Sequence, residues 1–212
     1  MESPARDADR HPDPDLVALP APRREERRFT VLLMVATALA SAWMIFSLRG
    51  EVGYALSSPA PLELGDLAQA TPAAELANRY VRASGLLASV GSIRYERPME
   101  GDSFRLAPLA GNPKVWIEIR VPEGMEGPKF APPTSFVGRL VPFREAGIRH
   151  AGLARSVEAA GGAKISPDAW VLVDGSSPRA SRWSIALGLL LAYFTGWNLY
   201  GVFKLMRRVR DV

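Results

Sequence analysis

The uncharged apolar segment from Phe29 to Leu48 is the feature that most restricts how this chain can fold. Its twenty residues, FTVLLMVATALASAWMIFSL, contain no Asp, Glu, Lys or Arg. An α-helix of about 20 residues crosses the roughly 30 Å hydrocarbon core of a bilayer. A second apolar segment covers residues 183–203. We therefore predict two transmembrane helices, which oblige every other part of the chain to lie on one side of a lipid bilayer or the other.

Basic residues flank both apolar segments on the sides that face the chain termini. Four precede the first segment and four follow the second: Arg23, Arg24, Arg27, Arg28, Lys204, Arg207, Arg208 and Arg210. Such residues are enriched on the cytoplasmic side of membrane helices. We expect both termini to be cytoplasmic and residues 49–182 to be periplasmic, across a bacterial inner membrane. The bacterial origin is suggested by the excess of Arg over Lys and the many Ala, Gly and Pro residues.

A cleaved signal peptide is the alternative for the first segment. A signal has a shorter apolar core and a cleavage site with small residues directly after it. Here Arg49-Gly50-Glu51 follows at once, and the first acceptable site, Ala55-Leu56-Ser57, lies late. We expect an uncleaved anchor.

The remaining segments divide into two tails and one domain. Residues 1–28 are rich in Pro, Asp and Ala and are predicted to be a disordered cytoplasmic tail, and residues 204–212 a short basic one. Residues 49–182 are numerous enough for a single domain. Their charges are mixed in sign, which does not favour nucleic acid as a partner. The chain has no cysteine, so disulfides and thiolate metal sites are excluded.

Short strands dominate the pattern of this middle domain. Alternating apolar residues or flanking turns predict strands at 80–82, 93–96, 103–106, 114–121, 136–141 and 169–173. Residues 61–78 read as helical, because leucines precede Thr71-Pro72, a typical helix start. Residues 152–160 fit one short helix. The predicted class is α+β: two transmembrane helices flanking a small, mostly-β domain, either a barrel or a sandwich, for which an OB-like barrel suits the size.

Residues that could carry catalysis are few. The two histidines are His11, in the predicted disordered tail, and His150, in an apparent surface turn. Neither has a second His or a spaced carboxylate pair nearby, as a zinc site requires. No nucleophile elbow, phosphate-binding loop or dinucleotide fingerprint is present. We predict no catalytic, cofactor-binding or metal-binding residues.

One arginine-rich stretch is a candidate partner surface. Arginine and tyrosine are favoured at interface hot spots, although a strand face of this kind is ordinarily just solvated. Trp116 lies on the same strand face as Glu118 and Arg120, which is predicted to be exposed to solvent, so Trp116 is a candidate exposed contact. The candidate surface comprises Arg94, Tyr95, Arg97, Arg105 and Trp116.

Small residues recur at helical spacing in both apolar segments. Gly188, Ala192 and Gly196 share one face of the second segment. In the first segment Ala36 and Ala40 share one face, and Ala38 and Ala42 share another. Such faces let a second helix approach closely, whether the other span or a foreign helix. Asn198, deep in the second span, is expected to hydrogen-bond a neighbouring helix.

The layout also resembles a known family. Trp170-Val171-Leu172-Val173-Asp174-Gly175 and Ala192-Tyr193-Phe194-Thr195-Gly196-Trp197 are similar to a strand and a last-helix pattern of the surfeit-locus assembly factors of haem-copper oxidases. That family carries one helix near each end and a β-rich outer domain. The resemblance implies a role in maturing or stabilising an oxidase. It implies no site residues, because Arg49-Gly50-Glu51-Val52-Gly53 stands where the family has Gly-x-Trp-Gln.

These patterns favour a non-enzymatic, double-pass membrane protein. Its outer domain is expected to dock on or stabilise a membrane protein complex, and its partners to be a membrane protein or a second copy of the chain. A small-molecule sensor anchored by two helices is the alternative, and a membrane enzyme is the third hypothesis.

Overall fold

The computed structural model describes residues 24–97, 101–125, 130–147, 150, 152–160 and 164–207, with the side chains of residues 24–26 outside this description. The chain divides into two compact units. One unit is the domain from Phe46 to Leu189, and the other combines the chain up to Ile45 with the chain from Leu190 onward. The predicted disordered tail lies outside the described residues up to position 23.

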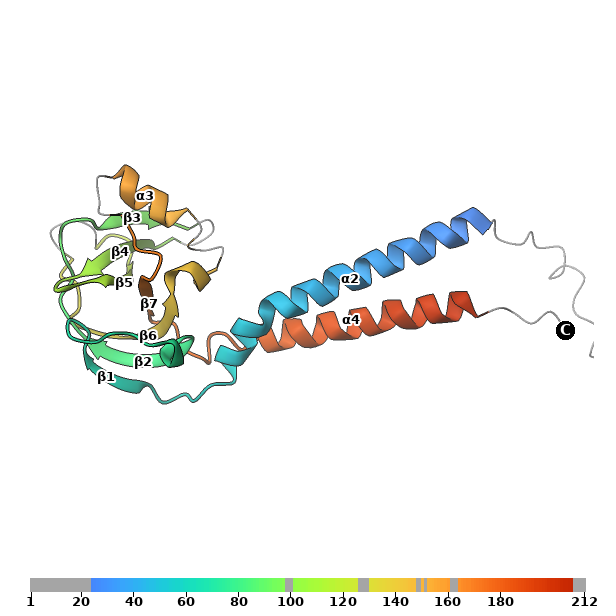
Figure 1. The fold of residues 1–212 in the computed structure, drawn as a ribbon, viewed down its shortest axis with the longest axis horizontal. Coiled ribbons are helices and arrows are strands. Elements are labelled where there is room, and N and C mark those ends of the chain that lie inside the picture. The colour runs from blue at the N-terminus through green and yellow to red at the C-terminus, as the bar shows by residue number, and fades with distance from the viewer. Residues whose placement is uncertain are drawn as a thin grey trace, which may run out of the picture. The chain divides into compact units, whose positions relative to one another are not determined.

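Two long helices carry the apolar segments (Figure 1). Helix α2 covers Arg24–Ala55 and α4 covers Trp183–Met206. Both begin or end beyond the predicted spans, so the helix includes the arginines before Phe29 and the residues after Leu48. By length and composition, both helices could cross a membrane.

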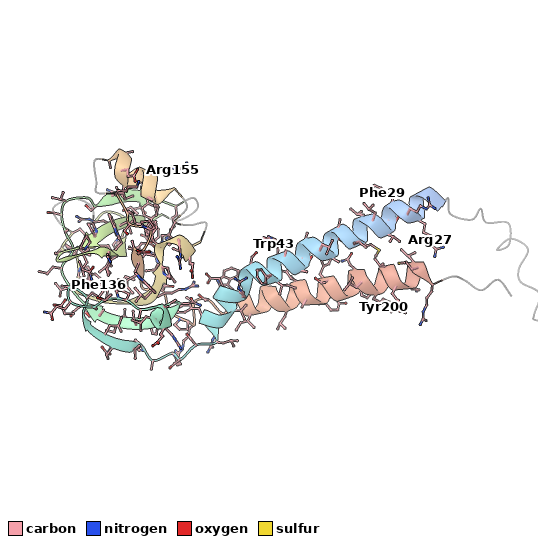
Figure 2. The ribbon with its side chains drawn as sticks, in the orientation of Figure 1. Arg27, Phe29, Trp43, Phe136, Arg155 and Tyr200 are labelled. Atoms are coloured by element: carbon pink, nitrogen blue, oxygen red, sulfur yellow. The ribbon has the colours of Figure 1, made fainter. Side chains whose placement is uncertain are left out.

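The helices expose their large apolar side chains along most of their length. Phe29, Trp43 and Tyr200, labelled in Figure 2, are 68, 70 and 60% exposed. A core helix of a water-soluble protein would bury such residues. Their exposure is what a lipid-facing helix requires.

The described strands form one mixed sheet. The strands are β1 (Leu62–Asp66), β2 (Arg79–Ser84), β3 (Ile93–Glu96), β4 (Ser103–Leu109), β5 (Asn112–Val121), β6 (Ser135–Pro142) and β7 (Trp170–Asp174). Their order is β1-β2-β6-β7-β5-β4-β3. Neighbours β1 and β2, and β5 and β7, run parallel, and the remaining pairs are antiparallel. The expectation was a barrel or sandwich; the observed pairing is a single seven-stranded sheet with two edge strands.

Each face of the sheet has its own buried apolar cluster. The first includes Ile117 and Leu172 together with Phe136, which Figure 2 labels. The second includes Trp116 and Val171 and is covered by residues of α3 (Leu153–Ala159). Successive residues of a strand point to opposite faces, so β5 and β7 contribute to both clusters. The domain is therefore α+β, with its central strands buried on both sides.

Most predicted strands are confirmed. β3 has the predicted bounds, and β5, β6 and β7 match within a few residues. The short helix predicted at 152–160 is also confirmed as α3. Local alternation and turn residues were sufficient here, because these strands are bounded by glycines and prolines.

The predicted helix over 61–78 is wrong. Residues Leu62–Asp66 form the edge strand β1, which pairs in parallel with β2, and only the single turn η1 (Ala74–Leu76) is helical. Gly65 has φ +70°, which a right-handed helix does not allow. The strand pairing and the burial of Leu67 outweigh the local helix signals.

Candidate functional site

A buried polar cluster lies on the face of the sheet that α3 covers. We call it the Glu118 cluster; its members are Tyr95, Arg97, Glu118 and His150. Glu118 lies in the middle of β5, opposite Leu106 of β4 and Val173 of β7. Tyr95 comes from β3, Arg97 directly follows that strand, and His150 comes from the connection between β6 and α3. Segments far apart in the sequence therefore meet at one carboxylate.

Each oxygen of the Glu118 carboxylate accepts hydrogen bonds. The Tyr95 hydroxyl donates to Oε2 over 2.7 Å, and the Arg97 Nη2 donates to Oε1 in an ion pair. His150 Nε2 also contacts Oε2. Glu118 is 1% exposed and His150 6% exposed. A buried carboxylate is tolerated only with such partners, because an unpaired buried charge is strongly destabilising.

Aromatic rings enclose the cluster. The Arg97 guanidinium lies over the Phe104 ring, 3.8 Å from its centroid, and Tyr95 stacks on the same ring at 5.8 Å. Phe143 meets the imidazole of His150 edge-on at 6.4 Å. Because these rings exclude water, the charges of the cluster interact more strongly than they would at the surface.

The hydrogen bonds of His150 restrict which ring nitrogens carry hydrogen. Nδ1 lies 2.9 Å from the carbonyl oxygen of Ala146, which can only accept, so Nδ1 carries a hydrogen. Oε2 of an ionised Glu118 can also only accept, so its bond to Nε2 requires a second hydrogen. The alternative form places that hydrogen on the carboxyl group and leaves the ring neutral. In both forms one proton lies between Nε2 and Oε2.

The surroundings of Glu118 favour its ionised form. Burial alone would raise its pKa, but the hydrogen bonds and charges of His150, Tyr95 and Arg97 outweigh burial and lower the pKa below its ordinary value. Burial and the adjacent Glu118 raise the pKa of Tyr95, so the phenol stays protonated and remains a donor. Arg97 is held charged, because Glu118 outweighs burial and raises its pKa.

This arrangement joins structural elements and leaves no open acid or base. A general base needs a nitrogen or oxygen directed at a substrate, whereas both ring nitrogens of His150 are occupied by groups of the chain itself. Within the described part of the chain, no group of three or more His, Cys, Asp or Glu is placed to hold a metal ion. The cluster ties the segment that leads to α3 to the centre of the sheet.

The structure divides the predicted partner surface between the two faces of the sheet. Arg94 and Arg105 are paired across β3 and β4 on one face, and Arg105 donates to Ser92 Oγ at 3.2 Å. Tyr95 and Arg97 belong to the Glu118 cluster on the other face. Strand alternation causes this separation, because neighbouring residues point in opposite directions. The five residues do not form one surface.

The predicted exposure of Trp116 is wrong. Trp116 is 2% exposed and belongs to the second apolar cluster, and Glu118 on the same side of β5 is buried as well. The alternation of Ile and Val with charged residues in β5 predicts that one face of the strand is exposed to solvent. The covering of that face by α3 and its flanking segments, which comes from later in the chain, buries it instead.

Sequence reasoning missed Glu118 and His150. Glu118 was read as a solvated residue and His150 as part of a surface turn. The one available signal for burial of Glu118 was its position between Ile117 and Ile119, two residues after Trp116, in the longest apolar strand. No local pattern indicates that His150, 32 residues later, returns to that strand.

The contact between the two helices includes some of the predicted residues, Ala38 and Asn198 among them, and others that were not predicted. Asn198 is 6% exposed, and its Oδ1 accepts a hydrogen bond from Thr37 of α2 at 3.2 Å. Ala38 and Ser41 are buried, and a Cβ atom on Gly201 would lie 2.4 Å from Met34 Cε. By contrast, the following predicted residues are exposed: Ala36, Ala40, Ala192 and Gly196.

Within the domain unit, the end of α2 is attached to the sheet. Arg139 of β6 donates to Glu51 Oε1 and to Asn78 Oδ1, both at 2.6 Å. Asn78 Nδ2 donates to the carbonyl of Gly50 at 2.8 Å. The fully buried Tyr54 donates to the carbonyl of Ser176 at 2.5 Å. Gly188 of α4 lies near this attachment, since a Cβ atom there would be 3.9 Å from Val52.

The clefts of the domain include two that are lined by described residues. One, of about 360 Å³, is bordered by Arg144, Glu145 and Asp168 around Trp170. The other, of about 330 Å³, lies beside Asp66, Ser84 and Leu86. Neither is lined by Arg94, Tyr95 or Trp116 of the candidate partner surface.

Comparisons with known proteins give no family for this chain. No family model matches it, and no curated protein and no solved structure matches it significantly. The resemblance to the surfeit-locus assembly factors therefore stands on the layout of segments alone.

Proposed function

We propose that the chain is a double-pass membrane protein whose α+β domain docks on or stabilises a membrane protein complex, as an accessory or assembly factor without catalytic activity. Two observations support the membrane part: α2 and α4 are long enough to cross a bilayer, and their large side chains are exposed. The Glu118 oxygens and both His150 ring nitrogens are occupied by groups of the chain itself, which is consistent with a domain that binds rather than catalyses.

The observation that carries the docking role is the position of the small residues. Ala192 and Gly196 of α4 are exposed, and a Cβ atom on Gly196 would meet nothing within 4 Å. They are not used in the contact between the two helices. A smooth, outward face of this kind lets a helix of another protein, or of a second copy, approach closely.

Co-purification from mild detergent tests the docking role. We expect the wild-type chain to be recovered with a membrane protein partner, and the Gly196→Leu variant to lose that partner. Leu190→Phe is the matched control, because Leu190 is exposed on a different side of α4. Recovery of the wild type as a lone monomer, or retention of the partner by Gly196→Leu, contradicts the proposal.

We further propose that both termini are cytoplasmic and that the domain is periplasmic, in a bacterial inner membrane. The support is the set of basic residues at the start of α2 and the end of α4. The absence of cysteine makes the test simple: a single cysteine at Ser58 should react with a membrane-impermeant maleimide from the periplasm, and one at Val212 should not. The reverse pattern contradicts this orientation.

A further inference from the structure

A groove lies between the start of α2 and the end of α4. Its volume is about 630 Å³. Five of its seven lining residues are apolar, and Arg27 and Arg28 supply the other two: Arg27, Arg28, Val31, Leu32, Val35, Leu205 and Met206. Figure 2 labels Arg27 at this end of α2. The groove is thus largely apolar, with two arginines at the end nearest the start of α2.

The charges around this groove are all of one sign among the side chains that the structure describes. Residues 27–45 and 190–207 include Arg27, Arg28, Lys204 and Arg207 and contain no Asp or Glu. The Arg207 guanidinium lies over the Phe203 ring, 4.6 Å from its centroid. Glu25 and Glu26 precede Arg27 in the sequence, but their side chains lie outside this description. The groove fits an anion that has an apolar part.

The dimensions fit a lipid. Arg28 and Val35 are seven residues apart, so the apolar wall extends about 10 Å from the guanidinium groups along the helix axis. This places the arginines at the level of lipid headgroups and the wall beside the first part of an acyl chain, if the apolar residues lie in a bilayer. A guanidinium binds phosphate through two parallel hydrogen bonds.

We propose that this groove binds one anionic phospholipid. Its phosphate contacts Arg27 and Arg28, and one acyl chain lies against Val31, Val35 and Leu205. This inference rests on the proposed membrane role. A free phosphate would leave the apolar wall unused, whereas a phospholipid fills both parts of the groove; basic pockets between membrane helices are a known way to bind anionic headgroups.

The test measures which lipids remain on the full-length chain. The protein is reconstituted in nanodiscs of phosphatidylcholine with a minor share of phosphatidylglycerol, then released into detergent and weighed by native mass spectrometry. We expect retention of phosphatidylglycerol well above its share in the disc. Replacing both arginines, Arg27→Gln with Arg28→Gln, should lower that retention about tenfold or more, since each basic residue contributes about 1 kcal/mol.

Three further variants distinguish binding in the groove from general charge attraction. Val35→Trp fills the groove and keeps every charge, and it should lose phosphatidylglycerol like the arginine variant; Leu39→Trp, on an exposed position outside the groove, should not. Lys204→Gln with Arg207→Gln removes the same charge from outside the lining and should retain the lipid. Unchanged retention in Val35→Trp, or equal loss in the Lys204 and Arg207 variant, overturns the proposal.

Failure of the membrane role would be recognised separately. If alkaline carbonate releases the chain from native membranes, the proposed function fails, and the lipid site with it. If the chain stays in the membrane but binds phosphatidylglycerol no better than its share, the lipid site alone is wrong. Displacement of the lipid by inorganic phosphate at millimolar concentration would also contradict the site, because it would show that the apolar wall contributes nothing.

Discussion

His150 and Glu118 share a hydrogen bond between Nε2 and Oε2 beneath the segment that connects β6 to α3. The same imidazole also bonds its own segment through Nδ1 and the Ala146 carbonyl, at 2.9 Å. One side chain thus links the centre of β5 to a connection more than thirty residues away. These hydrogen bonds therefore help to hold α3 over the second apolar cluster, which mutation of either residue can test.

Replacing the central carboxylate should destabilise the domain severely. Glu118→Gln removes the carboxylate charge that pairs with Arg97, at a position where Glu118 is 1% exposed. Breaking a buried ion pair costs about 3–5 kcal/mol, which lowers the unfolding midpoint of a chain of this size by roughly 10 °C. Thermal unfolding of the full chain in detergent, followed by tryptophan fluorescence, measures it. Glu96→Gln, at an exposed position of β3, is the control and should change little.

The stability of the domain should fall in acid because of Glu118. Its pKa in the folded chain is below the ordinary value of 4.5, so the folded state binds the proton less readily than the unfolded state. The stabilisation is fully present above pH 4.5 and is lost as the pH falls through the lower, folded-state pKa. Unfolding midpoints measured from pH 7 downward should show this loss. A wild-type acid dependence identical to that of Glu118→Gln would contradict the assignment.

Replacing the histidine should loosen α3 before it unfolds the whole domain. His150→Phe removes both hydrogen bonds of the ring, whereas His150→Gln keeps an amide donor that can reach the carboxylate. We expect faster hydrogen exchange in Leu153–Ala159 for the Phe variant and a smaller increase for the Gln variant. Unfolding midpoints should follow the same order. Equal exchange in all three proteins would show that the His150 contacts do not hold this segment.

Gly138 should tolerate no side chain. A Cβ atom there would lie 2.0 Å from the carbonyl oxygen of Val173 on the neighbouring strand β7, and a backbone atom cannot move aside. Gly138→Ala should therefore destabilise the domain by several kcal/mol, in the range of severe core substitutions. Gly53→Ala, where a Cβ atom meets nothing within 4 Å in α2, should be neutral or slightly stabilising. Folded yield and unfolding midpoint measure both.

Sequence patterns were sufficient where the deciding contacts are local. Ile93–Glu96 forms a strand with the predicted bounds because its partner β4 follows a few residues later. The two apolar helices were also recognisable from length and composition alone. In both cases the residues carry the determining property themselves, either alternation or continuous hydrophobicity.

Sequence patterns failed where distant residues decide. Leu62–Asp66 carries helix-like leucines but becomes a strand because β2 pairs with it. Glu118 and Trp116 were predicted to be solvent-exposed, because no residue near them in the sequence indicates that α3 covers their face of the sheet. The same applies to the helix contact. Small residues were recognised on two faces of the first helix, at 36 and 40 and at 38 and 42, but the sequence did not reveal the rotation of the helix, which buries Ala38 and Ser41 and leaves the other alanines exposed. Burial that depends on tertiary packing overrides local propensity.

The place of β7 in the sheet has a consequence for biosynthesis. β7 is the last strand to leave the ribosome, yet it lies fourth of seven, between β6 and β5. Before β7 is available, the sheet exists at most as two halves, β1-β2-β6 and β3-β4-β5. The inner edges of these halves, at β6 and β5, are then unpaired and prone to aggregation. Nascent chains that end before Trp170 should therefore require a chaperone. Those extending past Asp174 should be released from it, because the final strand joins the halves and removes both edges.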